Sequence, residues 1–106
     1  MNIYSIIITT TDSKHIAASI QEEIIKNKLS PCVHIINNVE SSFWWSKNII
    51  NQQEIGVIIK TRDDKVKAVV STINNFHNYE NPEIIKLDFE ILNTDYLYWF
   101  NDSIKE

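Results

Sequence analysis

The chain has 106 residues, of which 43% are hydrophobic, and it contains one glycine and two prolines. This length and composition predict one compact globular domain over residues 1–106, without linkers or disordered segments. The net charge of −4 provides no basic surface to neutralise phosphates, which excludes nucleic acid as an expected partner. The longest apolar run, Ile6 to Ile8, is far shorter than the roughly 20 residues of a membrane-spanning helix, so no membrane contact is expected.

The cysteine content and the N-terminal residues bear on cellular location. A single cysteine, Cys32, cannot form a disulfide within the chain. The residues from Met1 to Ser5 lack the positive charge with which a secretory signal begins. Both features predict a cytoplasmic location.

The first 30 residues predict a strand followed by a helix. Residues Ile3–Thr9 form a β-branched and nearly continuous apolar run, which is typical of a strand covered on both faces. Thr11 and Asp12 carry side-chain oxygens that suit a helix N-terminus. A helix is expected to continue to about Lys28. Its apolar residues recur at helical spacing, at Ile16, Ala17, Ile20 and Ile24.

A long hairpin is expected next. Pro31 cannot continue a helix, and the extended pattern after it predicts a strand from Cys32. Residues Asn37–Asn38 tolerate left-handed backbone and predict a bulge in this strand. A turn at Ser46–Asn48 then leads to the β-prone residues Ile49–Thr61, which predict the second strand of the hairpin.

The remaining residues predict a helix, a strand and a terminal helix. Asp63 and Asp64 suit a helix N-terminus because the macrodipole is positive there. The apolar stripe that follows consists of Val66, Val69, Val70, Ile73 and Phe76. Past Pro82, residues Ile84–Phe89 predict a strand. Asn93 or Thr94 is expected to cap the last helix. Its apolar face holds Leu97, Phe100 and Ile104.

The predicted order, βαββαβ followed by a helix, is that of an α+β ferredoxin-like sandwich, in which two helices cover one face of an antiparallel sheet. The other face of such a sheet ordinarily meets water. Here the first and third strands carry apolar residues at consecutive positions, so the second face is apolar as well. Since a chain of this size has no further element to cover that face, we expect it to assemble with copies of itself.

Three segments carry a resemblance to a known family. They read KLSPCV at Lys28–Val33, SFWWSK at Ser42–Lys47 and FHNYENPEII at Phe76–Ile85. With these segments at these spacings, nearly the whole chain resembles the CutA family, the small proteins tied to divalent-cation tolerance. The resemblance implies a homotrimer of ferredoxin-like subunits, in which long hairpins make sheet contacts between neighbours.

Cys32 and His34 are the first candidate metal ligands. They are two residues apart on a predicted strand, so a thiolate and an imidazole are expected on the same face. These groups favour copper or zinc over magnesium or calcium. Alternatively, Cys32 is a small buried hydrophobe and His34 an ordinary strand residue. The resemblance implies copper at Cys32, whose match in the family is linked with that metal, whereas His34 has no counterpart in the family pattern.

His77 is the third candidate metal ligand, or alternatively a solvated residue at a helix end. The family pattern here is His-Pro-Tyr, then two residues, then Pro-Glu. The chain keeps His77, Tyr79, Pro82 and Glu83 but has Asn78 in place of the first proline, which predicts a less rigid loop. The resemblance also implies a cleft between subunits. The residues expected to line it are Glu54, Lys60, Tyr79 and Glu83, although charged residues on strands are more often simply solvated.

Three tryptophans are expected to pack, in part against a neighbouring subunit. Trp44 and Trp45 are adjacent on a strand and therefore lie on opposite faces, so one of them is expected at an interface. The family usually has glycine where Ser46 stands, which puts the tight turn there in question. Trp99 lies in a segment similar to the family's terminal Tyr-Leu-x-Trp and is expected to pack.

No enzyme is expected, because a Gly-rich phosphate loop, a nucleophile elbow and a His-Glu-x-x-His helix are all missing. The leading hypothesis, which rests mostly on the resemblance, is a trimeric cytoplasmic protein of copper or general divalent-cation tolerance. Cys32 then binds copper or another divalent metal, assisted by His34 or His77, and folding needs no metal. The alternative is a signalling or scaffold trimer, built like the PII proteins, that binds a small anion in clefts between subunits through Lys60. An interaction module of the kind linked with acetylcholinesterase anchoring has no support in these residues.

Overall fold

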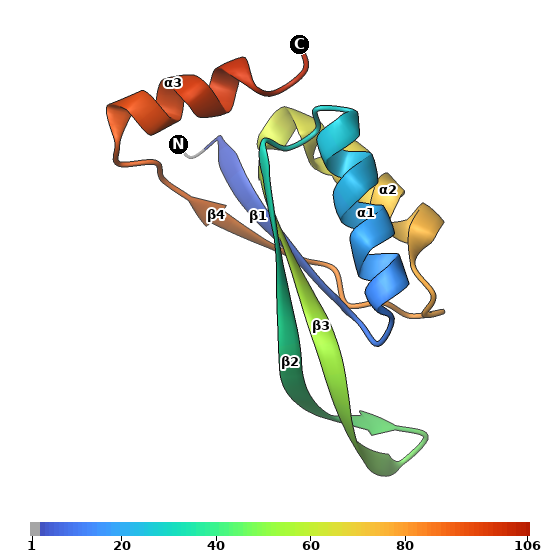
Figure 1. The fold of residues 1–106 in the computed structure, drawn as a ribbon. Helices are drawn as coiled ribbons and strands as arrows, with labels where there is room; N and C mark the ends of the chain where they lie inside the picture. The colour runs from blue at the N-terminus through green and yellow to red at the C-terminus, as the bar shows by residue number, and fades with distance from the viewer. Residues whose placement is uncertain (1–2) are drawn as a thin grey trace.

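The computed structural model describes residues 3–106. These residues fold into one antiparallel sheet with two helices packed on one face (Figure 1). The strand order is β2-β3-β1-β4. This is the predicted ferredoxin-like arrangement with an additional C-terminal helix. The elements are β1 (Tyr4–Thr11), α1 (Lys14–Lys26), β2 (Cys32–Trp45), β3 (Asn48–Arg62), a 3-10 turn (Asp63–Lys65), α2 (Val66–Phe76), β4 (Ile85–Phe89) and α3 (Thr94–Asp102).

The N-terminus of α1 differs from the prediction. Ser13 is the cap, and its Oγ accepts a hydrogen bond from the Ile16 N–H at 3.2 Å. The expectation that Thr11 or Asp12 caps this helix is wrong because β1 continues through Thr11, which pairs with Ile55 of β3. The N-cap is therefore Ser13, one residue after the predicted Asp12.

The other helix ends follow local backbone chemistry. α1 ends before Lys28, which takes a left-handed φ of 56°. α2 begins at Val66, because the predicted acidic start lies in the preceding 3-10 turn. Asn93 caps α3 as predicted, accepting a hydrogen bond from the Tyr96 N–H at 3.2 Å. Within residues 3–106, none of the helices is long and apolar enough to cross a membrane.

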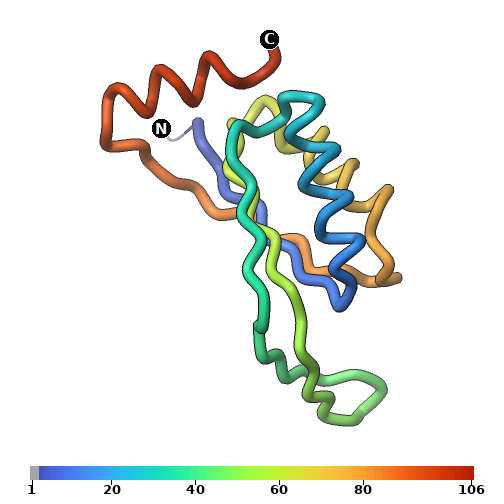
Figure 2. The backbone as a smooth tube through the Cα atoms, viewed as in Figure 1, coloured from blue at the N-terminus to red at the C-terminus, as the bar shows by residue number. Residues whose placement is uncertain are grey.

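β2 and β3 form a hairpin that projects beyond the rest of the chain (Figure 2) and gives the molecule extents of 46 × 24 × 22 Å. The register shifts between Ile36 and Val39, where Asn38 has a φ of 62°, so the predicted bulge is confirmed. Ser46 and Lys47 have φ values of 49° and 65°. Positive φ at both central residues is what a type I′ turn requires. The tight turn is therefore present without the glycine that the family resemblance led us to expect.

The hydrophobic core lies between the sheet and the two helices α1 and α2. The inward residues of β1 alternate along the strand and are fully buried, and their partners on β3 are buried as well. A second, smaller cluster forms where Phe100 and Ile104 of the C-terminal segment pack against Tyr4 and Phe89. The main core consists of Ile7, Ala17, Ile20, Ile24, Ile55, Val57, Ile59, Val69 and Ile73.

The other face of the sheet is apolar, and α3 covers it only at the end where Tyr4 and Phe89 lie. Ile6 and Ile8 of β1 are only half-buried within the single chain, so the chain itself does not provide the second cover expected for this strand. On the neighbouring edge strand, Ile85 is 46% exposed and Leu87 is 52% exposed. We call the part of this surface beyond the reach of α3 the open face. Within residues 3–106 no helix packs on its apolar side chains.

Candidate functional site

Cys32 and His34 lie side by side on β2, as their spacing predicted. The Cys32 Sγ is 3.4 Å from His34 Nε2. The thiol is half-buried, whereas the imidazole is exposed. The neighbouring residues Val33 and Ile35 pack toward the core, so the alternation of the strand points Cys32 and His34 to the open face.

The chemistry of this pair fits a soft metal ion. Zinc bonds of about 2.3 Å to thiolate sulfur and about 2.0 Å to imidazole nitrogen together exceed the 3.4 Å separation, so one ion can contact both atoms. Residues 3–106 contain no group of three His, Cys, Asp or Glu side chains that converge on a single ion. This part of the chain therefore provides two ligands, and the other coordination positions need ligands from outside it.

His77 lies elsewhere, at the end of α2. Its Nε2 is 2.8 Å from the Thr10 carbonyl oxygen, and its Nδ1 accepts a hydrogen bond from the Tyr79 N–H at 3.0 Å. A donor at Nε2 and an acceptor at Nδ1 define the neutral imidazole. The Nε2 contact links the end of α2 to β1, and the Nδ1 contact fixes the loop that follows. The structure does not bring His77 close to Cys32.

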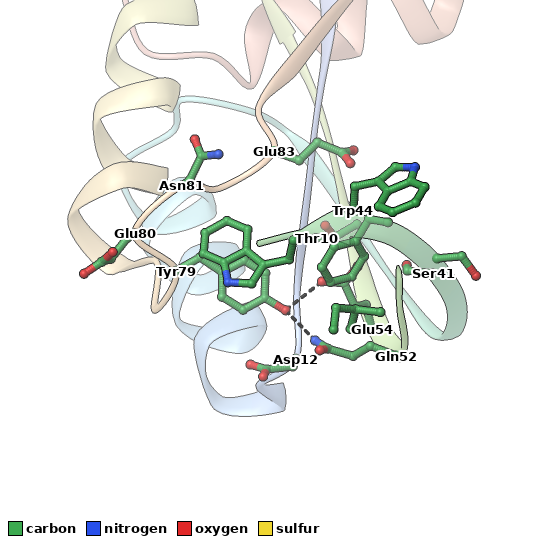
Figure 3. Close-up of a pocket in the computed structure, with 14 residues that line it drawn as sticks. Thr10, Asp12, Ser41, Trp44, Gln52, Glu54, Tyr79, Glu80, Asn81 and Glu83 are labelled. Atoms are coloured by element: carbon green, nitrogen blue, oxygen red, sulfur yellow. Dashed lines mark hydrogen bonds between the residues drawn. The ribbon is translucent and has the colours of Figure 1, made fainter. Parts of the chain in front are cut away.

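A cavity of about 690 Å³ lies between the hairpin and the loop after α2 (Figure 3). It brings together three of the four residues predicted for a cleft, Glu54, Tyr79 and Glu83. The fourth, Lys60, is not among its lining residues and lies instead opposite Cys32 in the β2–β3 ladder. The lining residues are Thr10, Asp12, Ser41, Ser42, Phe43, Trp44, Trp45, Ile50, Gln52, Glu54, Tyr79, Glu80, Asn81 and Glu83.

Tyr79 is the hydrogen-bonding centre of this cavity (Figure 3). Its hydroxyl donates to Glu54 Oε2 at 2.6 Å and accepts from Gln52 Nε2 at 3.0 Å. Burial raises the pKa of Tyr79 above its ordinary value, and the hydrogen bond to the Glu54 carboxylate raises that pKa further. The phenol is thus held in its neutral form, in which it donates a hydrogen bond to the carboxylate of Glu54.

The charged residues around the cavity are all acidic. Four carboxylates line it, and its lining includes no Lys or Arg. A negatively charged cavity opposes the binding of a small anion. The negative charge makes this cavity unsuitable as the anion-binding site of a PII-like protein. The carboxylates are those of Asp12, Glu54, Glu80 and Glu83.

Asn78 has a role that sequence reasoning missed. Its Oδ1 accepts a hydrogen bond from Thr11 Oγ1 at 2.6 Å, and its Nδ2 donates to Asp12 Oδ1 at 2.8 Å. A proline at this position has no side-chain donor or acceptor. Where we expected a less rigid loop, Asn78 ties the loop to the end of β1 by two hydrogen bonds.

The three tryptophans are largely exposed within the single chain. Trp44 and Trp45 lie next to each other near the tip of the hairpin and both line the cavity. Trp44 is 71% exposed. Trp99 lies on α3, with its ring centroid 5.3 Å from that of Tyr96, and is also exposed. Their packing against a neighbouring subunit stays a prediction.

The sequence did not lead us to predict two further cavity residues, Gln52 and Asp12. Gln52 lies two positions before Glu54 on the same strand, so alternation alone predicts a shared face. Asp12 follows the last residue of β1. Its place beside the loop after α2 depends on tertiary structure, and no signal in the sequence pointed to it.

Comparison with known proteins gives consistent matches along the chain. A family model described as CutA1 divalent ion tolerance protein matches residues 5–103. Protein CutA 1, chloroplastic, of Oryza sativa subsp. japonica is 32% identical over 101 residues, which cover 95% of this chain but only 57% of the rice protein. The divalent-cation tolerance protein CutA of Pyrococcus horikoshii is 30% identical over 101 residues, which cover 95% of this chain and 98% of that protein.

Solved structures agree with these matches. CutA1 from Ehrlichia chaffeensis superposes with a TM-score of 0.88 at 33% identity, covering 97% of this chain and 96% of that one. CutA1 from the psychrotrophic bacterium Shewanella sp. SIB1 superposes with a TM-score of 0.93 at 30% identity, covering 99% and 98%. From the family match over residues 5–103 and the shared fold, the chain belongs to the CutA1 family of divalent ion tolerance proteins.

Proposed function

We propose that the chain forms a cytoplasmic homotrimer that contributes to divalent-cation tolerance by binding a soft metal ion, copper in preference to magnesium or calcium, and that it catalyses no reaction. The observation that carries this proposal is the 3.4 Å approach of Cys32 Sγ to His34 Nε2 on an exposed strand surface. Thiolate and imidazole are the donors that select copper and zinc. The names of the relatives, which refer to divalent-cation tolerance, agree with a metal ligand.

The position of the pair on the open face supports an assembled form. A row of directly paired residues crosses the sheet beside His34, consisting of Ile58, Ile8 and Ile85. A partner that covers such exposed apolar side chains stabilises the assembly, by about 25 cal/mol for each Å² of apolar surface removed from water. A threefold assembly also supplies three copies of Cys32 and His34, and so offers more ligands than one chain provides.

Metal titration of matched variants tests this proposal. Reduced protein is titrated calorimetrically with Cu(II) and Zn(II) as wild type, Cys32→Ser, His34→Gln and His15→Gln. Cys32→Ser is expected to lower the copper affinity at least tenfold, and His34→Gln several-fold. His15 lies exposed on α1, away from the pair, so His15→Gln should bind like wild type. Equal affinity in wild type and Cys32→Ser contradicts the assignment of Cys32.

A further inference from the structure

Lys60 lies directly opposite Cys32 in the β2–β3 ladder and brings a positive charge to the metal-binding pair. We propose that Lys60 is a specificity-determining residue, which makes Cys32 and His34 select monovalent copper, Cu(I), over divalent ions. This inference rests on the metal site proposed above and adds the charge of the ion that the site takes.

The sheet register fixes Lys60 next to Cys32. The two residues are directly paired on antiparallel strands, so their side chains leave the same face with Cβ atoms about 4.5–5.5 Å apart. Ser30 holds this end of the ladder, because its Oγ accepts a hydrogen bond from the Cys32 N–H at 3.1 Å and is also hydrogen-bonded to the Lys60 carbonyl oxygen. The Lys60 side chain therefore starts from a fixed point beside the thiol.

The charge of Lys60 is not balanced within the described part of the chain. Among residues 3–106 its ammonium group forms no ion pair. The next residues along the same row of the sheet, Ile6 and Leu87, are apolar. Lys60 is itself half-buried, so solvent screens its charge less than that of a fully exposed lysine.

This unbalanced charge distinguishes monovalent from divalent ions. A metal ion binds the thiolate form of cysteine, so the thiol proton is released when the ion binds. Cu(I) restores the charge of that proton, and the total charge beside Lys60 is unchanged. A divalent ion adds one further positive charge, which the ammonium group repels. Lys60 therefore weakens the binding of divalent ions and leaves the binding of Cu(I) almost unaffected.

The number of ligands favours the same ion. Cys32 and His34 are the two soft ligands that approach each other, and residues 3–106 contain no converging group of three. Cu(I) forms stable complexes with as few as two soft ligands, whereas structural zinc takes four. The pair therefore comes closer to the coordination that Cu(I) needs than to that of zinc.

A groove at the edge of the sheet gives access to the pair. It has a volume of about 580 Å³ and lies between α1 and the start of β2, with Glu22 and Ile25 of α1 among its lining residues. Cys32 lines this groove as well. An ion can therefore reach the thiol from the edge of the sheet when copies of the chain cover the open face.

Competition titrations with Cu(I) and Zn(II) test the proposal. Reduced protein is titrated without oxygen, with Cu(I) against bicinchoninate and with Zn(II) against a zinc-binding dye. Lys60→Met is expected to raise the Zn(II) affinity about tenfold and the Cu(I) affinity by less than about threefold, because only the divalent ion adds charge. Lys60→Arg keeps the charge and should retain the wild-type ratio of the two affinities. Lys67, exposed on α2, is the matched control, and Lys67→Met should also retain that ratio.

An unchanged ratio of the two affinities in Lys60→Met overturns the proposal, as does a shift of the same size in Lys60→Arg. If Lys60→Met does not fold, Lys60→Gln replaces it and has the same expected result. A change in assembly alters both affinities alike, so the ratio excludes it as the cause.

Cys32→Ser separates failure of this inference from failure of the metal site. Equal Cu(I) affinity in wild type and Cys32→Ser removes the site and the role of Lys60 together. Weaker Cu(I) binding by Cys32→Ser, with an unchanged ratio in Lys60→Met, rejects the role of Lys60 alone.

Discussion

The Tyr79 hydroxyl donates a 2.6 Å hydrogen bond to the Glu54 carboxylate and so joins the loop after α2 to β3 across 25 residues of sequence. Tyr79→Phe leaves that carboxylate in place without its donor. We expect the free energy of unfolding to fall by about 1–3 kcal/mol, the usual cost of an unsatisfied buried group. Urea denaturation measures this change. Tyr98→Phe, at an exposed position on α3, is the control and should cost almost nothing; equal losses in the two variants contradict the account.

The same contact predicts a loss of stability at alkaline pH. Burial first, and the Glu54 hydrogen bond second, raise the pKa of Tyr79 in the folded protein above the value of about 10 in the unfolded chain. The folded state therefore keeps a proton that the unfolded state releases. The stabilisation is complete below about pH 10, declines as the pH rises above 10, and is gone once the pH passes the folded pKa.

Thermal unfolding of wild type and Tyr79→Phe between about pH 8 and about pH 11 measures this effect, because other groups titrate equally in both proteins. The stability difference between them should be constant at the lower values and shrink above pH 10. A difference that grows or stays constant there rules out Tyr79 as the source.

Asn78 predicts a second local contribution to stability. Asn78→Ala removes the hydrogen bonds to Thr11 and Asp12, and we expect it to lower the free energy of unfolding by about 1 kcal/mol. Asn81→Ala, at an exposed position in the same loop, should change stability by less than half of that. The denaturant midpoints of the two variants, each compared with wild type, measure these losses of stability. A larger loss in Asn81→Ala means that these hydrogen bonds do not hold the loop.

The order of elements could be predicted because each periodic pattern is local. Apolar residues every three to four positions gave the helices, and Asn37–Asn38 gave the bulge through the left-handed tolerance of asparagine. The cap of α1 could not be predicted. Whether Thr11 caps a helix or extends β1 depends on its pairing with Ile55, which lies far away in the sequence.

The same distinction applies to the candidate sites. Alternation on one strand is sufficient to place Cys32 next to His34. The family resemblance grouped Lys60 with Tyr79 in a cleft between subunits; within the single chain Lys60 lies opposite Cys32, and its place in such a cleft stays a prediction. Local patterns contain no information about such contacts between distant segments, which is also why the hydrogen bond from Thr11 to Asn78 was missed.

The open face predicts a variant that blocks assembly without unfolding the chain. Ile85→Lys places a charge on that face at the edge strand β4, at a side chain already 46% exposed in the single chain. We expect monomers with wild-type circular dichroism. Asp88→Lys adds lysine to an exposed position of β4 on the other side of the strand and should leave assembly intact. Normal assembly by Ile85→Lys excludes this face as the contact surface.

The measurement that tests the central claim most directly is the mass of the metal-free protein by light scattering. The claim is that the apolar open face, with Cys32 and His34 on it, is covered by copies of the same chain. The account predicts three times the subunit mass of 12.4 kDa, with or without added copper. A mass of 12.4 kDa under both conditions contradicts it, because the open face would then be exposed to water and each chain would have only its own two ligands.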